Sequence, residues 1–206
     1  MFLYNFSGRI SQKEFHLSLI DLRSDLGEFK GEKLFFFSEP SMVLTGVIIS
    51  KKDNKKKPAT MLLFENGTCD IEKEYRFIES FLNKEHLVLI LDVRGVGGVK
   101  VRKINYRDII EIYGSEFKLA YDAIMRTSTF SMRVFDVLRG FDYLKTRSDV
   151  DPEKIGIYGK GISSLYAFFA MAIEPKIRKG TFENMLLSYE DVVETRIYNR
   201  KVVNEQ

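Results

Sequence analysis

Short apolar runs separated by turn residues dominate the chain from residue 34 onward. Apolar, β-branched and aromatic residues fill Leu34–Phe37 and Met42–Ile49, and the segment Ser38–Ser41 between them is rich in turn formers, so two strands around a turn are predicted. Ala59–Phe64 predicts a short buried strand. His86–Asp92 is almost wholly apolar, which is typical of a parallel strand covered on both faces.

Helical spacing of apolar residues appears between and after these strands. A helix between the second pair of strands, which completes a βαβ unit, is predicted by Ile71, Tyr75, Ile78 and Leu82. A longer helix, ended by Asp149–Pro152, is predicted by Met132, Phe135, Leu138, Phe141 and Leu144. Strands that alternate with helices predict an α/β fold with an open, mostly parallel sheet and helices on both faces.

The segment after the long helix predicts a strand, a tight turn and a helix in immediate succession. These are Ile155–Tyr158, Gly159–Gly161 and the apolar run Ile162–Ile173. A further strand at Met185–Tyr189 and a helix at Glu190–Tyr198 follow. Because such sheets bind ligands at the carboxyl ends of their strands, the loops after three strands are expected to open onto one crevice, namely those after Phe64, Asp92 and Tyr158.

The length and composition favour one globular domain. The 206 residues are 45% hydrophobic, which is ample for a buried core. We take residues 1–30 as a weakly patterned lead-in and residues 31–206 as the α/β domain. The basic cluster Lys51–Lys57 falls between two predicted strands and contains no aromatic residue, so a solvated hairpin tip is favoured over a nucleic-acid patch.

Several classes of function are disfavoured by composition. The charge is nearly balanced, with 32 Lys and Arg against 29 Asp and Glu, so no strong field attracts nucleic acid. Cys69 is the sole cysteine, which excludes an internal disulfide and any zinc site with several thiolates. No cofactor or metal site is predicted. Since no signal peptide or run of about 20 apolar residues is present, we expect a cytoplasmic protein without membrane contact.

The order of several motifs resembles one branch of a known superfamily. The later blocks are Tyr113–Phe117, Met132–Arg139, Asp142–Leu144, Arg147–Pro152 and Gly156–Ser163, and the earlier ones are Phe37–Pro40 with Gly46, Leu62–Gly67 and Asp92–Gly97. Together they resemble the acetylxylan-esterase-like branch of the α/β-hydrolases, over about residues 34 to 198. The resemblance implies an esterase acting on an acylated carbohydrate or another small ester.

The resemblance places the nucleophile elbow on Gly159-Lys160-Gly161-Ile162-Ser163. In this motif a serine occupies a strained turn between strand and helix, and its position here is held by Gly161, which has no side chain and forms no acyl-enzyme. Glycine tolerates the unusual backbone of such a turn, so the shape can persist without the chemistry.

A shifted frame offers Ser163 as an alternative nucleophile. That frame ends in Leu165 where a small residue belongs, and it puts the serine inside the first helical turn. The structural interpretation of Ser163 and Ser164 is helix capping and surface hydrogen bonding. A third interpretation, an anion site formed by the backbone donors from Gly159 to Ser164 with Lys160 nearby, fits the spacing less well.

The remaining catalytic groups of a serine esterase are also missing from the pattern. The histidines are His16, in the lead-in, and His86, at the end of its strand opposite the crevice. The resemblance implies that the strands carrying the acid and the histidine come later than this sequence extends. We therefore expect a C-terminally truncated hydrolase sheet whose open edge is covered by a second copy or by a completing chain.

The resemblance assigns an oxyanion hole to backbone donors of Asn66, Gly67 and Ile162. Glu65 departs from that pattern, because a carboxylate there repels an oxyanion. Two hypotheses stay open: a catalytically weak or inactive relative that binds a ligand or partner in the crevice, and an active esterase that uses Ser163.

Overall fold

The chain forms one mixed sheet with helices on both faces. The computed structural model describes residues 25–40, 42–53, 55–100, 127–188, 190 and 194. The strands are β1 (Asp25–Leu26), β2 (Phe29–Glu39), β3 (Met42–Lys51), β4 (Lys57–Leu63), β5 (Leu87–Asp92), β6 (Val150–Lys160) and β7 (Lys179–Glu183). The helices are α1 (Tyr75–Leu82), α4 (Thr129–Thr146) and α5 (Ile162–Ile173), with 3₁₀ turns η3 (Gly67–Asp70) and η4 (Gly97–Val99).

The strands lie in the order β1-β2-β3-β5-β4-β6-β7. The neighbours β5, β4, β6 and β7 run parallel, as predicted. The pairs β1–β2, β2–β3 and β3–β5 are antiparallel, so the prediction of a mostly parallel sheet is correct only for the half that carries the strand-turn-helix segment. The physical reason is the short connection between β2 and β3, because a parallel pair needs a crossover of a dozen or more residues.

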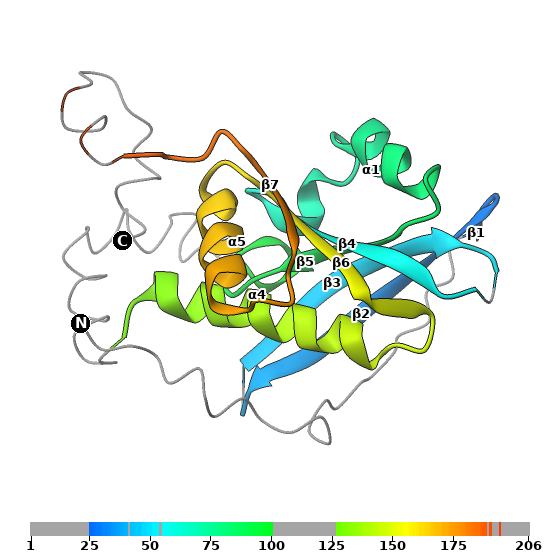
Figure 1. Cartoon of the computed structure of the whole chain (residues 1–206), viewed down its shortest axis with the longest axis horizontal. Coiled ribbons are helices and arrows are strands. Elements are labelled where there is room, and N and C mark those ends of the chain that lie inside the picture. Colours follow the sequence, from blue (N-terminus) through cyan, green and yellow to red (C-terminus); the bar gives the residue numbers. More distant parts are fainter. Residues whose placement is uncertain are drawn as a thin grey trace, which may run out of the picture.

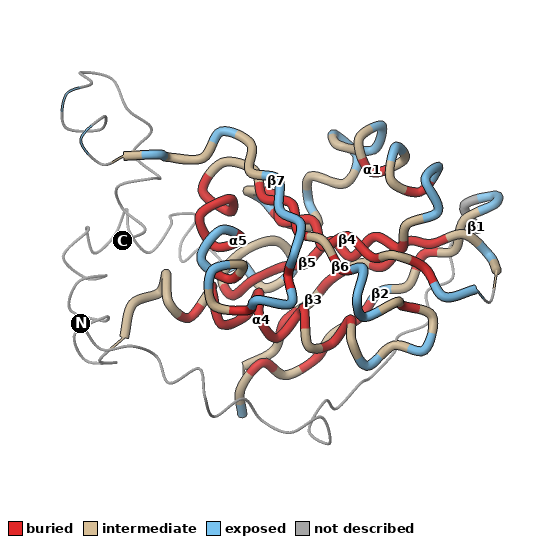
Figure 2. The backbone as a smooth tube through the Cα atoms, viewed as in Figure 1, coloured by how far each residue is buried: buried red, intermediate tan, exposed pale blue. Residues whose placement is uncertain are grey.

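Each face of the sheet has its own hydrophobic core. Alternate residues of the strands pack under α4 and α5 on one face, where Phe36, Met61, Leu89 and Phe141 are fully buried. The other face packs Leu62, Ile90 and Tyr158 against Ile78 and Leu82 of α1. Figure 1 shows α4 and α5 side by side on one face, and Figure 2 shows β4 and β5 buried along nearly their whole length.

The basic connection between β3 and β4 differs from the predicted hairpin tip. The two strands do not pair with each other, because β3 pairs with β5 and β4 lies between β5 and β6. Lys57 is only 4% exposed, and its ammonium donates to the carbonyl of Lys51 (3.1 Å) and pairs with Asp53. The end of the basic cluster is therefore part of the structure of β4.

Two strands, β6 and β7, have boundaries that differ from the predicted ones, because pairing with neighbouring strands sets them. β6 begins at Val150, opposite Lys57, and its next paired residue is Ile155, opposite Ala59, so the residues between them bulge out of the ladder. β7 is Lys179–Glu183, whereas Met185–Ser188 is irregular although Met185 and Leu186 pack against the core. The strand predicted from apolar content at Met185–Tyr189 is wrong, because pairing with β6 selected the preceding segment.

The predictions for the two ends of the chain have different outcomes. β1 and the start of β2 precede residue 31, so the sheet begins inside the segment taken as a lead-in. Residues 1–24 lie outside the described residues, and the helix predicted at Glu190–Tyr198 lies almost wholly outside them.

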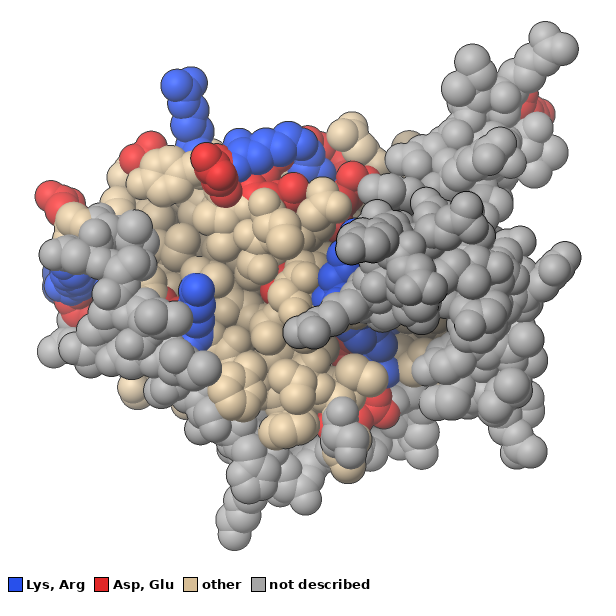
Figure 3. All heavy atoms as spheres, turned by 180° about the vertical axis from the view of Figure 1, so that it is seen from behind, with Lys and Arg blue, Asp and Glu red and all other residues tan. Residues whose placement is uncertain are grey.

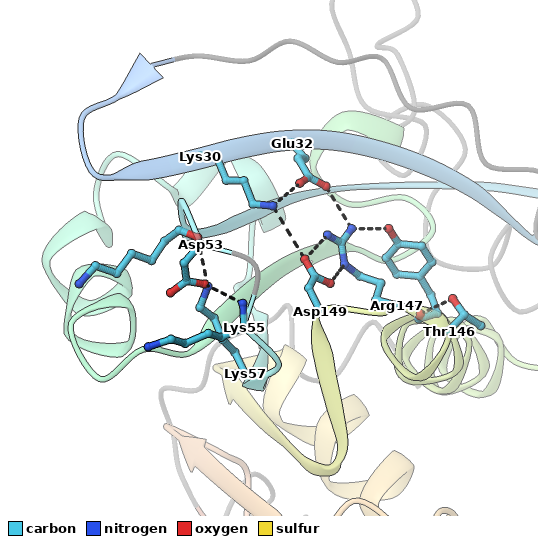
Figure 4. A network of polar contacts seen from close by, with 10 residues as sticks. Lys30, Glu32, Asp53, Lys55, Lys57, Thr146, Arg147 and Asp149 are labelled. Carbon is cyan, nitrogen blue, oxygen red and sulfur yellow. Dashed lines mark hydrogen bonds and ion pairs between the residues drawn. The ribbon is translucent and has the colours of Figure 1, made fainter.

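An ion-pair network ties the end of α4 to the sheet (Figure 4). Arg147 donates two hydrogen bonds to Asp149, at 2.8 and 2.7 Å, and a third to Glu32 of β2 at 3.1 Å. Burial alone would raise the pKa of Asp149, but the hydrogen bonds from Arg147 outweigh it and hold that pKa below its ordinary value. The network fixes the turn from which β6 starts.

Charges of both signs share the surface seen in Figure 3. Where described residues are visible from that side, Lys and Arg lie among Asp and Glu around a broad uncharged area.

Candidate functional site

The strand-turn-helix segment has the backbone of a nucleophile elbow. β6 ends at Lys160, α5 begins at Ile162, and Gly161 between them has φ 60° and ψ −131°. A Cβ at Gly159 would lie 2.5 Å from Cα of Ser164 and 2.8 Å from the carbonyl oxygen of Ser163, so only glycine allows the helix to approach the strand so closely. The elbow shape expected from the sequence is therefore present.

The space beside Gly161 that a serine side chain would need is filled by Glu65. A Cβ added at Gly161 would overlap the Glu65 carboxylate, at 2.5 Å from Cδ and 2.7 Å from Cγ. Glu65 follows β4, so it reaches the elbow from the neighbouring strand. The positive φ adds a second penalty for any residue with a side chain. Glu65 and Gly161 thus fit each other, and a nucleophile does not fit between them.

Ser163 and Ser164 face inward. Ser163 is 2% exposed and its hydroxyl donates to the carbonyl oxygen of Phe64 at 3.2 Å. Ser164 is fully buried and its hydroxyl donates to the carbonyl of Gly161. The helix has Gly161 at its N-cap without a side-chain cap, so the interpretation of these serines as surface capping residues is wrong. Their hydroxyls bind the ends of β4 and β6 to the first turn of α5.

The rim of the elbow carries a network of charged groups. Lys160 pairs with Glu74 (2.9 Å) and with Glu183 of β7 (3.2 Å). The Glu74 hydrogen bond raises the pKa of Lys160, and the hydrogen bond from the Tyr158 hydroxyl (2.5 Å) lowers the pKa of Glu183. With its charge balanced by two carboxylates, Lys160 gives little attraction for the bound anion considered from the sequence.

The loop predicted to supply an oxyanion hole uses its donors internally. The backbone N–H of Asn66 donates to Asp70 at 3.0 Å, and that of Gly67 donates to the carbonyl of Phe64 at 3.1 Å. An oxyanion would have to displace both hydrogen bonds and would meet the Glu65 carboxylate beside Gly161. The role given to Asn66, Gly67 and Ile162 stays a prediction.

Asp92, at the carboxyl end of β5, holds the two neighbouring loops together. Its carboxylate accepts hydrogen bonds from the Thr45 hydroxyl (2.8 Å), the Thr68 N–H (2.6 Å) and hydroxyl (2.8 Å), and the Gly98 N–H (2.9 Å). Asp92 is 1% exposed. A Cβ at Gly97 would lie 2.7 Å from Oδ2 of Asp92, so this turn requires glycine. The loops after β4 and β5 do meet at one edge of the sheet, as predicted.

A second buried carboxylate fixes the loop after β5 to α4. Arg94 donates to Asp136 from its N–H (2.9 Å), Nε (2.8 Å) and Nη2 (2.7 Å), and to Glu39 from Nη2 (2.7 Å). Burial alone would lower the pKa of Arg94, but the two carboxylates raise it above its ordinary value. Arg133 joins this loop to α5 through the Arg94 carbonyl (3.0 Å) and the Tyr166 hydroxyl (2.8 Å).

His86 lies far from the elbow. Its Nδ1 hydrogen-bonds the Thr60 hydroxyl at 2.9 Å, and Thr60 stands opposite Gly156 in the ladder, about 16 Å along β6 from Gly161. Burial, followed by the charge of Lys179, lowers the pKa of His86. His16 lies outside the described residues. In the part of the chain that the structure describes, no imidazole reaches the elbow.

A separate cavity opens beside His86, on the α1 face of β4, β6 and β7. Its volume is about 560 Å³, and it is lined by Phe81, Tyr158, His86, Arg178 and Lys179 among others. Within the described ranges, no cluster of His, Cys, Asp or Glu could hold a metal ion, and no helix is long and apolar enough to cross a membrane.

Sequence reasoning missed most of the contacts around Gly161. Glu65 is recognisable in the sequence as a departure from the family pattern, and the structure places its carboxylate against Gly161. Sequence reasoning did not find Glu74 or Glu183 as partners of Lys160, because neither stands near Lys160 in the sequence. No local signal identifies these two, since only the crossovers of the sheet bring them together.

The sheet order, the antiparallel β3 and the elbow after β6 define the α/β-hydrolase fold. An acetyl xylan esterase from Paenibacillus sp. R4 is similar over 93% of this chain and 60% of its own, with a TM-score of 0.65 and 16% identity. Acetyl xylan esterase 1 from Thermoanaerobacterium sp. JW/SL YS485 is similar over 81% of this chain and 51% of its own, with a TM-score of 0.59 and 18% identity.

Other comparisons agree with that fold. A glucuronoyl esterase from Solibacter usitatus matches 82% of this chain and 51% of its own, with a TM-score of 0.56 and 12% identity. The Bacillus subtilis protein YtaP, named as a hydrolase, is 35% identical over 49 residues, which are 24% of this chain and 16% of that protein. No protein-family model matches the sequence. The chain spans between 51% and 60% of the length of the three esterase structures named here.

Proposed function

We propose that this chain is a non-catalytic member of the esterase-like α/β-hydrolases, in which the elbow is kept for its shape. The observation that carries the proposal is the contact between Gly161 and Glu65, because the carboxylate fills the space of the nucleophile. Ser163 does not take over the role, since its buried hydroxyl donates to the carbonyl of Phe64. A nucleophile also needs a base within hydrogen-bond reach, and His86 stands about 16 Å away along the sheet.

A fluorophosphonate probe followed by intact-mass measurement tests this proposal. We expect no adduct on the wild-type chain and no turnover of p-nitrophenyl acetate. The matched control is Ser163→Ala, which removes the one hydroxyl of the alternative mechanism. A stoichiometric adduct on the wild-type chain that disappears in Ser163→Ala would establish an active serine esterase and overturn the proposal.

The surface at the elbow, where the loops after β4 and β6 meet, is proposed to bind an acylated carbohydrate or another small ester without cleaving it. The support is the fold shared with the acetyl xylan esterases and the meeting of three strand-end loops at one edge. Calorimetric titration with an acetylated xylo-oligosaccharide and with its deacetylated form provides the test. We expect heat of binding from the acetylated form only, and a changed affinity in Glu65→Ala. Equal heats for both forms, or no heat for either, would contradict the proposal that the ligand is an acylated carbohydrate.

A further inference from the structure

β7 is the strand at one edge of the described sheet. β7 pairs with β6 only, so its outer edge carries backbone groups that no other described strand pairs with. Figure 2 shows this strand largely exposed, whereas the part of β6 from Ile155 to Gly159 is mostly buried. The strand at the opposite edge of the sheet, β1, is only two residues long. Natural sheets protect a longer free edge by covering it or pairing it.

Helix α5, beside this edge, has an apolar face turned outward. From Ile162 to Ile173 it contains no charged residue, and a helix that is apolar all round is normally buried. Phe168 and Phe169 are nevertheless 43% and 44% exposed. Phe168 packs edge-on against Phe182 of β7, at 5.6 Å between ring centroids, so the apolar face of the helix continues into the strand.

The side chains of β7 alternate between the two faces of the sheet. Lys179 and Thr181 line the cavity on the α1 face, and Glu183 on the same face accepts from the Tyr158 hydroxyl. Phe182 lies on the α5 face. Lys179, Gly180 and Thr181 are exposed, and the Glu183 side chain is 43% exposed. Lys179 and Glu183, the first and last residues of β7, therefore both lie on the α1 face of this edge.

We propose that β7 is a homodimer interface, in which the β7 strands of two copies pair antiparallel about Thr181. In that register Lys179 stands opposite Glu183 of the second copy, and Glu183 stands opposite its Lys179. The strand Lys179-Gly-Thr-Phe-Glu183 is thus complementary in charge to itself when it is reversed. Opposite charges directly across an antiparallel pair stabilise it, and like charges destabilise it.

A two-fold axis perpendicular to the sheet places the other exposed features beside the interface. Such an axis keeps corresponding faces on the same side, so the α5 helices of both copies, with Phe168 and Phe169, lie on one side of the seam. The cavity beside Lys179 lies on the other side and borders the same seam. The two sheets then form one continuous sheet with β1 at each end.

Charge reversal tests the register of this pairing. In Lys179→Glu both cross-strand pairs become Glu opposite Glu, and in Glu183→Lys both become Lys opposite Lys. We expect the wild-type chain to dimerise in sedimentation velocity, and each variant alone to dimerise about ten- to a hundredfold more weakly. An equimolar mixture of the two variants restores both attractive pairs, so heterodimers are expected where neither variant self-associates.

Two controls keep this test specific. Lys33→Glu makes the same charge change at an exposed lysine of β2, and we expect it to dimerise like the wild type. Glu183→Lys also loses the contacts to Tyr158 and Lys160, so its folding is checked by thermal unfolding. If this variant does not fold, the weaker dimerisation expected of Lys179→Glu carries the test by itself. A wild-type chain that stays monomeric at hundreds of micromolar, or a mixture that associates no better than its components, would overturn the proposal.

Discussion

Two glycine turns at the same edge of the sheet each meet a carboxylate, and the two contacts have different consequences. At Gly97 the neighbouring carboxylate is Asp92, which is buried and accepts four hydrogen bonds. At Gly161 it is Glu65, which is only partly buried. The first arrangement holds loops in place, whereas the second occupies the space in which this fold places its nucleophile. A tight glycine turn is thus compatible with either role, and the partners of the carboxylate decide between them.

The largest effect is expected when the Asp92 contact is removed. Asp92→Ala leaves two backbone N–H groups and two hydroxyls without their acceptor at a site that is 1% exposed. We expect the free energy of unfolding to fall by about 3–5 kcal/mol, because each unsatisfied buried donor is costly. Urea unfolding measures it, with Asp70→Ala as a matched removal of a less buried aspartate. A loss below about 1 kcal/mol would mean that water replaces the carboxylate.

The elbow contact is tested by adding a side chain to Gly161. Gly161→Ser places a Cβ against Glu65 and strains a backbone with φ 60°, so we expect a loss of about 2 kcal/mol in urea unfolding. In the background of Glu65→Ala the same substitution should cost about half as much, because only the backbone strain remains. Equal losses in both backgrounds would show that Glu65 moves aside freely.

The double variant also separates shape from chemistry. Gly161→Ser with Glu65→Ala restores a serine at the elbow and clears the space beside it, yet we expect no hydrolysis of p-nitrophenyl acetate. The reason is the distance to His86, the histidine in the described part of the chain. Turnover above the wild-type background would identify a base that this structure does not bring to the elbow.

The contribution of a third carboxylate, Asp149, to the free energy of unfolding depends on pH. Arg147 holds its folded-state pKa below the ordinary value of 3.8, so the unfolded chain binds more protons between the folded pKa and 3.8. Its stabilising contribution is present above pH 3.8 and is lost as pH falls through the folded pKa. Asp149→Asn should unfold about 1 kcal/mol more easily at pH 7 and lose less stability below pH 4. Parallel acid-unfolding curves for both proteins would contradict this.

The smallest effect is expected from Glu65 alone. Glu65→Ala should change the free energy of unfolding by less than about 0.5 kcal/mol, because its carboxylate is partly exposed and a surface substitution costs little. Differential scanning calorimetry against Asp92→Ala sharpens the comparison, since both variants remove a carboxylate beside a glycine turn. A large loss would place Glu65 with Asp92 among the groups that hold the loops.

Much of the fold is predictable because its elements are local. Apolar periodicity located α5 from Ile162 to Ile173, and the buried runs before Phe64 and Asp92 located β4 and β5. β7 was misplaced, because its sequence is weakly apolar and only pairing with β6 makes it a strand. Lys57 was taken as solvated, because a run of basic residues does not show that the chain folds back and brings its ammonium to Lys51 and Asp53.

The sequence by itself determined the elbow, and with it the absence of a serine from the turn, because a glycine at a strand-to-helix junction is a local fact. Only the tertiary structure decided what that glycine faces. Glu65 reaches Gly161 from the adjacent strand, Ser163 turns toward Phe64, and the donors of the Asn66 loop are bound to Asp70 and Phe64. The physical reason is that a side chain's chemistry depends on its neighbours in space, and in a sheet with crossovers these come from distant parts of the chain.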